Sequence, residues 1–213
     1  MTRMNVAVCY VYPSLNRAVY DAMARRFVST YQEHPPGDHP HDLYVLLNGL
    51  KHAGLEKLFE PLPVRFLRHS NIGRDIGAYQ MAASRLDCDL MVCLGSPVHF
   101  HKDGWLDWLI ASYQDCGPAV YGPWAFHEPL PHIRTTAFWL PRFLLNAFPH
   151  LVGDPQRYEF EHGKESLTLW AKSLGYSTFM VTWDGTFGMK DWHHVTRDKS
   201  LLLDQHSERD HLK

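Results

Sequence analysis

Hydrophobic residues follow two different periods along the first half of the chain. Strands are predicted at residues 5–11, 43–49, 64–69 and 89–96, where apolar residues alternate with polar ones or form short unbroken runs. Helices are predicted at residues 17–31, 55–60, 79–86 and 104–114. In residues 17–31 the apolar positions recur at helical spacing, whereas 43–49 is almost entirely apolar, as expected for a strand covered on both faces.

This alternation of strands and helices is typical of an α/β fold. We expect a mainly parallel, doubly wound sheet whose strands are joined by right-handed crossovers. From about Gly117 the alternation gives way to short aromatic and proline-rich segments, then a helix within residues 158–176 and a strand at 177–183. Because no linker-like stretch separates the two halves, we predict a single domain over residues 1–213 whose second half extends the sheet and forms a pocket over it.

The composition excludes several classes of partner. Hydrophobic residues make up 45% of the chain and charged residues 21%, and the net charge is −2 with the histidines neutral. These values are ordinary for a globular protein, and the lack of a basic excess argues against nucleic acid or an anionic membrane as a partner. Cys9 and Cys93 lie inside apolar runs and no cysteine pair has C-x-x-C spacing, so zinc-cluster and dithiol chemistry are not predicted.

The chain also shows no targeting or membrane signal of its own. Its first residues predict a strand and not a signal peptide. No apolar run approaches the roughly 18 residues that a membrane-spanning helix needs. The expectation is a protein without a transmembrane segment in a reducing compartment, the cytoplasm.

Turn-forming residues follow three of the predicted strands. Ligands of open α/β sheets bind outside the carboxyl ends of the strands. The three ends are Tyr12-Pro13-Ser14, the turn in NIGRDIGAY (71–79), and Gly95-Ser96-Pro97. NIGRDIGAY is not a P-loop, because no Lys-Ser/Thr follows its second glycine, and it is not G-x-G-x-x-G.

Two interpretations of NIGRDIGAY remain open at this point. In the first, the amides around Asn71 and Gly73 approach a nucleotide diphosphate. Arg74 then pairs with the phosphates, and Asp75 accepts hydrogen bonds from the ribose or the base. In the second, Gly73 only supplies a positive φ angle, Asp75 caps the helix and Arg74 is solvated.

NIGRDIGAY, together with DLMVCLGSPVHFHKDGWLDWL downstream, resembles the core of GT-A glycosyltransferases. HIRTTAFWLPRFLLNAF and YEFEHGKESLTLWAKSLGY are similar to the acceptor-side half of such enzymes. The nearest likeness is to bacterial polysaccharide glycosyltransferases, including the rhamnan synthesis F type, over roughly residues 5–185. The resemblance implies a nucleotide-binding half at about 1–116 and an acceptor half at about 117–213.

The resemblance also implies an activity. Such an enzyme moves a sugar from a nucleoside-diphosphate sugar to an acceptor hydroxyl, here in polysaccharide or surface-glycan synthesis, with inversion at the anomeric carbon. The residues expected at the nucleotide sugar are those of the three strand ends: Tyr12, Pro13, Asn71, Gly73, Arg74, Asp75, Gly95, Ser96 and Pro97.

The sequence departs from the family at its metal motif. The family's Asp-x-Asp holds a divalent cation against the donor diphosphate, but the matching position, 95–97, has no carboxylate. Asp87-Cys88-Asp89 has the pattern, yet it precedes its strand and so lies at the opposite edge of the sheet. We therefore expect an enzyme without a metal, its leaving group stabilised by Arg74, backbone amides, and Arg134 or a C-terminal histidine. If Mg²⁺ or Mn²⁺ takes part, the candidate ligands are His99, His101 and His194, with Asp103 and His193 beside them.

Carboxylates near the predicted helix in 158–176 are candidates for the general base. The resemblance favours Glu165, at the start of SLTLWAKSL, with Glu161 and Glu159 as competitors. A helix-end acid stabilised by the helix dipole is the structural alternative. His132, Thr135 and Trp139 are expected to face the acceptor, because sugars stack on aromatic rings, although Trp139 also fits a core position.

Two other classes of protein fit the same turns. One is a different Rossmann-like enzyme acting on nucleotide sugars, such as a nucleotidyltransferase. The other is a glycan-binding domain without catalysis, for which the missing Asp-x-Asp is the argument.

Overall fold

The computed structural model describes residues 4–13, 16–49, 54–196 and 199–205. Its strands are β1 (Val6–Pro13), β2 (His41–Asn48), β3 (Val64–His69), β4 (Leu90–Leu94), β5 (Ala119–Gly122), β6 (Ala125–Phe126), β7 (His132–Ile133), β8 (Ala137–Pro141), β9 (Ser177–Thr182) and β10 (Gly185–Gly188). Its α-helices are α1 (Arg17–Glu33), α2 (Arg74–Arg85), α3 (Trp105–Cys116), α4 (Arg142–Ala147), α5 (Arg157–His162) and α6 (Leu167–Ser173), and η1 (Leu55–Leu58) and η2 (Met189–His194) are 3-10 helices.

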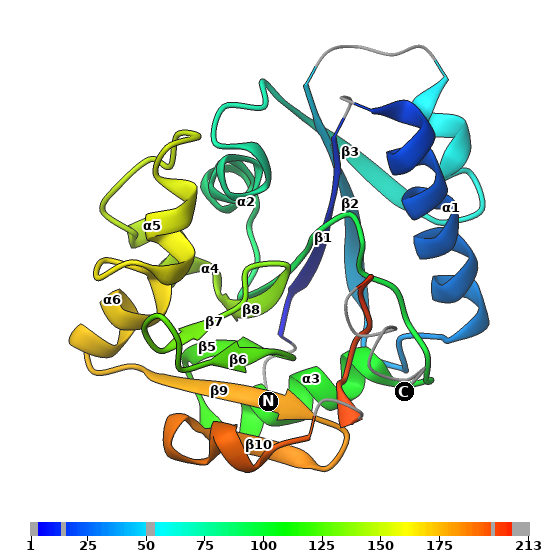
Figure 1. Ribbon diagram of the computed structural model, residues 1–213. Helices are drawn as coiled ribbons and strands as arrows, with labels where there is room; N and C mark the ends of the chain where they lie inside the picture. Colours follow the sequence, from blue (N-terminus) through cyan, green and yellow to red (C-terminus); the bar gives the residue numbers. More distant parts are fainter. Residues whose placement is uncertain (1–3, 14–15, 50–53, 197–198, 206–213) are drawn as a thin grey trace.

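Both halves of the chain contribute strands to one sheet. Its order is β10-β9-β5-β8-β4-β1-β2-β3. The strands β3, β2, β1 and β4 are parallel, and β9 is parallel to β5, whereas β8 runs antiparallel between β4 and β5. Strand β10 pairs antiparallel with β9, and β6 and β7 form a separate two-stranded ribbon (Figure 1). The predicted α/β class and mainly parallel sheet are confirmed.

Alternate residues of β1 enter two different cores. Val6, Val8, Tyr10 and Tyr12 pack with α1, η1 and α3 on one face of the sheet. Ala7, Cys9 and Val11 pack with α2 and the helices α4 to α6 on the other face. Successive strand residues point to opposite faces, so a fully buried strand needs apolar residues at every position, as β1 has. Figure 1 shows α1 and α2 on opposite sides of β1.

The predicted element boundaries hold best where the period is clear. Strand β3 has the predicted bounds, and α1 and α3 begin within one residue of the prediction. Helix α2 begins at Arg74, inside NIGRDIGAY, and not at Tyr79, so Arg74 and Asp75 form its first turn. The single helix predicted within 158–176 is two helices, α5 and α6, separated at Gly163. In the described ranges no helix combines the length and apolar character needed to span a bilayer.

Candidate functional site

A cavity of about 270 Å³ lies at the carboxyl ends of the parallel strands. Seven of the predicted nucleotide-sugar residues line it: Pro13, Asn71, Arg74, Asp75, Gly95, Ser96 and Pro97. The sheet therefore brings the three turns to one place, as the topology predicted. The lining residues that were not predicted include Asn48 at the end of β2, Thr136 before β8, Arg157 at the start of α5, and Gln205.

Tyr12 does not line this cavity, which corrects the prediction for that residue. Its side chain points into the core on the α1 side, since neighbouring strand residues face opposite ways, and Val11 and Pro13 line the cavity instead. The Tyr12 hydroxyl donates to the carboxylate of Asp21, and burial together with this contact raises the pKa of Tyr12 to about 12. Ser14, the last residue of that predicted turn, lies outside the described residues.

The backbone of the 71–74 turn is left-handed at three positions. The φ angles are 74° at Asn71, 70° at Gly73 and 51° at Arg74. A Cβ atom at Gly73 would lie 1.7 Å from the carbonyl oxygen of Val152, so only glycine fits there. The Gly73 amide donates to Asp154 Oδ1 at 3.0 Å. Gly73 thus serves close packing against the loop before α5, and it is not itself a lining residue of the cavity.

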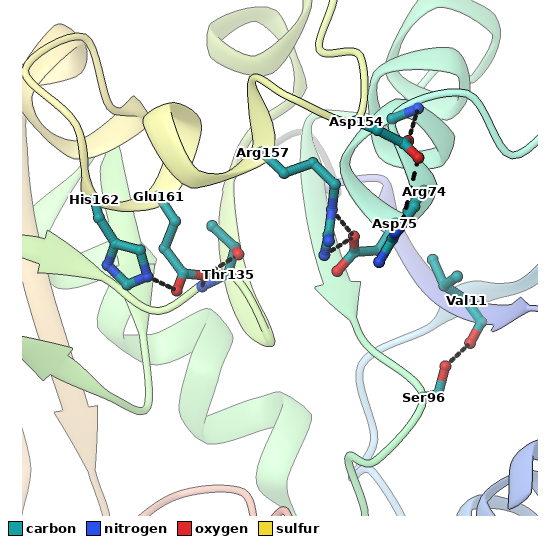
Figure 2. Close-up of polar contacts among 10 residues, drawn as sticks. Val11, Arg74, Asp75, Ser96, Thr135, Asp154, Arg157, Glu161 and His162 are labelled. Carbon is teal, nitrogen blue, oxygen red and sulfur yellow. Dashed lines mark hydrogen bonds and ion pairs between the residues drawn. The ribbon is translucent and has the colours of Figure 1, made fainter.

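Both charges of the turn are paired with residues of that same loop and helix. Arg74 Nε lies 3.5 Å from Asp154 Oδ2, and Arg157 Nη2 and Nε lie 2.7 and 3.0 Å from Asp75 Oδ1 (Figure 2). The Asp75–Arg157 pair is the more buried, with side chains 24% and 32% exposed, against 54% for Arg74. Arg74 is therefore an accessible cation at the cavity, whereas Asp75 is held by Arg157.

The 95–97 turn is fixed by hydrogen bonds to its neighbours. Ser96 Oγ donates to the Val11 carbonyl at 2.9 Å, and the Ser96 carbonyl accepts from the Tyr10 hydroxyl at 3.0 Å. The Gly95 amide donates to the Thr136 carbonyl at 2.7 Å. These bonds join the turn to β1 and to the segment before β8 and so hold this wall of the cavity.

Two buried polar atoms of cavity-lining residues lack a hydrogen-bond partner among the described residues: Asn48 Nδ2 and Asn71 Oδ1. His69 lies between them, with Nδ1 2.8 Å from Asn48 Oδ1 and 3.2 Å from the Asn71 backbone nitrogen. Burial lowers the pKa of His69. Buried polar groups are rarely left unpaired, so one donor and one acceptor here are available to a ligand.

A second polar cluster lies where α5 meets the segment around β7. Glu161 Oε2 accepts from the backbone amide of Thr135 at 2.7 Å and from the Thr135 hydroxyl, and Oε1 lies 2.8 Å from His162 Nε2 (Figure 2). His132 packs edge-on against His162, with ring centroids 4.3 Å apart. Burial lowers the pKa of His132.

The two candidate bases occupy different surroundings. Glu161 is one helical turn beyond the cavity-lining Arg157, and its side chain is 18% exposed. Glu165 precedes the N-cap Ser166 of α6, is 72% exposed, and lies 3.6 Å from His150 Nε2. Glu159 accepts from the Glu165 amide at 3.1 Å.

The expected acceptor contacts are not surface features. Trp139 is fully buried in the centre of β8, stacked on Tyr121 with centroids 5.9 Å apart, so its prediction as an acceptor contact is wrong and the core alternative holds. His132 and Thr135 are also buried, and they contact Glu161 and His162.

The predicted metal-ligand histidines do not gather. His99 Nδ1 lies 3.2 Å from the Pro97 carbonyl, His101 Nε2 lies 2.9 Å from the Ser200 carbonyl, and His194 is exposed in η2. Within the described ranges, the one group with ligand spacing is His132, Glu161 and His162, none of which the sequence analysis named as a metal ligand.

The fold is that of GT-A glycosyltransferases. Mouse xyloside xylosyltransferase 1 superposes with a TM-score of 0.56 at 9% identity, over 84% of this chain and 85% of that one. The mannosyltransferase PcManGT from Pyrobaculum calidifontis, solved with GDP-Man and Mn²⁺, superposes with a TM-score of 0.52 at 12% identity, over 69% of this chain and 47% of that one. This chain thus spans about half of the mannosyltransferase. No protein-family model and no curated protein sequence matches.

The residues at the cavity do not fit the divalent cation that this fold family implies. Asp87 and Asp89 lie at the amino end of β4, as predicted, and Asp89 Oδ2 accepts from the Asn5 amide at 2.8 Å. Among the lining residues, Asp75 is the only carboxylate, and Arg157 already neutralises it. Mg²⁺ and Mn²⁺ are usually held by carboxylates, phosphates and water, so a protein donor set for them is missing there.

Proposed function

We propose that this chain is a glycosyltransferase that moves a sugar from a nucleoside-diphosphate sugar to an acceptor hydroxyl. The observation that carries the proposal is the cavity itself, where three predicted strand ends meet beside two polar atoms that have no partner in the described part of the chain. The GT-A fold supports this reading because ligands of open α/β sheets bind at this edge. We propose polysaccharide or surface-glycan synthesis as the biological role, because NIGRDIGAY and the segments after it resemble bacterial polysaccharide glycosyltransferases.

The donor's charge is met by protein cations in this proposal. Arg74 is half exposed and exchanges Asp154 for a phosphate oxygen, while Arg157 remains on Asp75 and adds positive potential to the cavity wall. Asn48 Nδ2 and Asn71 Oδ1 bind the polar edge of the base or ribose. Fixed cations of this kind stabilise the departing diphosphate without a metal.

The acceptor hydroxyl loses its proton to Glu165 in this mechanism. Glu161 has both carboxylate oxygens engaged by Thr135 and His162, so neither is left to take the proton of an acceptor hydroxyl. The Glu165 carboxylate contacts only His150 among the described residues and faces solvent, from which an acceptor arrives. An in-line attack with this base inverts the anomeric carbon.

A thermal-shift series with nucleoside diphosphates and nucleotide sugars, with and without EDTA, tests the donor site, because ligands of the folded state raise the melting temperature. Arg74→Ala should weaken nucleotide binding by ~1.5–3 kcal/mol, the scale of a charged hydrogen bond. Arg85→Ala, at the other end of α2, is the matched control and should bind normally. Binding without sugar transfer would favour the glycan-binding class, and no nucleotide binding would refute the proposal.

A further inference from the structure

His132, Glu161 and His162 each offer a ligand atom, and these atoms lie within 4.8 Å of one another. His132 is 3% exposed, and the Glu161 and His162 side chains are 18% and 25% exposed. The cluster joins β7 to the end of α5, and its three residues do not line the donor cavity. Two imidazoles and a carboxylate within one partly buried space form a ligand set without an assigned role.

The surroundings already orient two of these side chains. His132 Nδ1 lies 2.8 Å from the Leu130 carbonyl, so Nδ1–H donates there and the lone pair is on Nε2. Glu161 Oε2 accepts from the amide and hydroxyl of Thr135, which leaves Oε1 directed toward His162. Metal-binding histidines and carboxylates have outer contacts of this kind, which fix the tautomer and direct the remaining lone pair.

His162 supplies the third position. Its Nε2 lies 2.8 Å from Glu161 Oε1, and its ring stands at 84° to that of His132. Its Nδ1 is buried and has no hydrogen-bond partner within the described part of the chain. Protein contacts within the described residues therefore hold one ring nitrogen of His162 and leave the other, buried one without a partner.

We propose that His132, Glu161 and His162 form a binding site for one zinc ion. Two histidines and one glutamate are a ligand set that zinc accepts, with a fourth position for water or a substrate oxygen. Imidazole ligands favour zinc over Mg²⁺, which prefers oxygen. On binding, zinc would replace the hydrogen bond between His162 Nε2 and Glu161 Oε1: the single N–H of the neutral imidazole moves to Nδ1, which leaves the Nε2 lone pair for the metal.

This site has a consequence for the cavity. Helix α5 begins with Arg157, which pairs with Asp75, and ends with His162. A zinc ion bridging His162 to His132 would fix α5 against β7 and so hold Arg157 in place. The inference does not require the proposed transfer, and it leaves Glu165 as the carboxylate available for base chemistry.

The test is metal binding by the full chain after removal of metals with a chelator. We expect one Zn²⁺ per chain by calorimetry, with Mg²⁺ binding far more weakly, and Co²⁺ giving the intense visible absorption of a four-coordinate site. Glu161→Gln and His162→Gln should abolish this high-affinity binding. Thr135→Val, which removes an outer contact, should weaken it about 10- to 100-fold.

The exposed pair His193 and His194, with ring centroids 3.8 Å apart, is the matched control. The double variant His193→Asn, His194→Asn should bind zinc as tightly as the unaltered chain. Loss of binding in that variant, or unchanged binding in Glu161→Gln and His162→Gln, would overturn the assignment. A weak, octahedral Co²⁺ spectrum from the unaltered protein would do so as well, whether or not a variant folds. Because the readout is bound metal, failure of the transfer proposal leaves this result intact.

Discussion

Arg157 Nη2 lies 2.7 Å from Asp75 Oδ1, and this ion pair joins the start of α5 to the start of α2 across 82 residues of sequence. Beside it, Arg74 faces Asp154 in the same loop. Each of the two charges in the NIGRDIGAY turn thus has a partner of opposite charge, Asp154 for Arg74 and Arg157 for Asp75. The pairing closes one wall of the cavity and leaves Arg74 the more accessible cation.

Loss of Arg157 should destabilise the fold more than loss of a surface arginine. Arg157→Gln leaves the partly buried Asp75 carboxylate unpaired, and we expect ~1–2 kcal/mol lower free energy of unfolding in urea. Arg68→Gln is the control, because it breaks the exposed pair with Glu56, whose side chains are 49% and 42% exposed. The free energy of unfolding should fall by less than ~1 kcal/mol in Arg68→Gln. Equal losses would mean that the Asp75–Arg157 pair is only a surface contact.

Two glycines that precede helices allow the stability cost of a left-handed backbone to be measured apart from the cost of a steric clash. Gly73 and Gly104 precede α2 and α3 with φ angles of 70° and 75°. A Cβ would meet the Val152 carbonyl at Gly73 but nothing within 4 Å at Gly104. Alanine at Gly104 should cost roughly 1–2 kcal/mol for the left-handed backbone. Gly73→Ala should cost about 1–3 kcal/mol more, and denaturation curves that show equal costs would contradict the packing role.

Asn71→Gly should separate ligand binding from stability. Glycine adopts the φ angle of 74° freely, and the change removes the buried Oδ1 atom that has no partner among the described residues. The melting temperature should therefore stay the same or rise. Nucleotide affinity should fall by ~1–2 kcal/mol, the scale of a lost hydrogen bond. A variant that binds nucleotide at full strength would remove Asn71 from the donor site.

The substitutions Glu165→Gln and Glu161→Gln test which carboxylate is the general base. Glu165→Gln should keep donor affinity and lower the transfer rate about 10²- to 10⁴-fold, the usual cost of removing a general base. Glu161→Gln should cost far less in transfer. If the rates change the other way round, Glu161 is the base. Product analysis by NMR adds an independent check, since retention of the donor's anomeric configuration would rule out this mechanism.

His69 should make stability depend on pH. Burial, with a smaller contribution from Arg85, lowers the pKa of His69 in the folded chain, so below about pH 6.5 the unfolded chain binds its proton first. Stability is then complete above that pH and falls as the pH drops toward the folded-state pKa. His41 and His132, whose pKa values burial also lowers, add to the same trend. Urea unfolding from pH 5 to 8 should therefore show a shallower acid loss for His69→Gln than for the unaltered chain, and parallel curves would exclude His69 as a contributor.

The sequence predicted the parts of this molecule that depend on local pattern. The bounds of β3 follow from the alternation of its apolar residues. The position of Asp87 and Asp89 at the amino end of β4 follows from the direction of the chain. The partners of the turn do not: nothing in the local pattern pairs Asp75 with Arg157, or places Asn48 at the cavity, because such contacts depend on how distant loops pack. Trp139 shows the same limit, since its strand lies in the sheet centre and both of its faces are covered.

The last described residues complete the cavity that the first strands begin. Leu201 and Leu202 are buried in the same core as β1, Leu203 pairs with His99, and Asp204 lies 2.9 Å from Arg134 Nη1. Gln205 then lines the cavity. During synthesis these residues leave the ribosome long after β1 to β4 have emerged. A nascent chain can therefore assemble its parallel strands early, but the lining of the cavity is incomplete until residue 205 has left the exit tunnel.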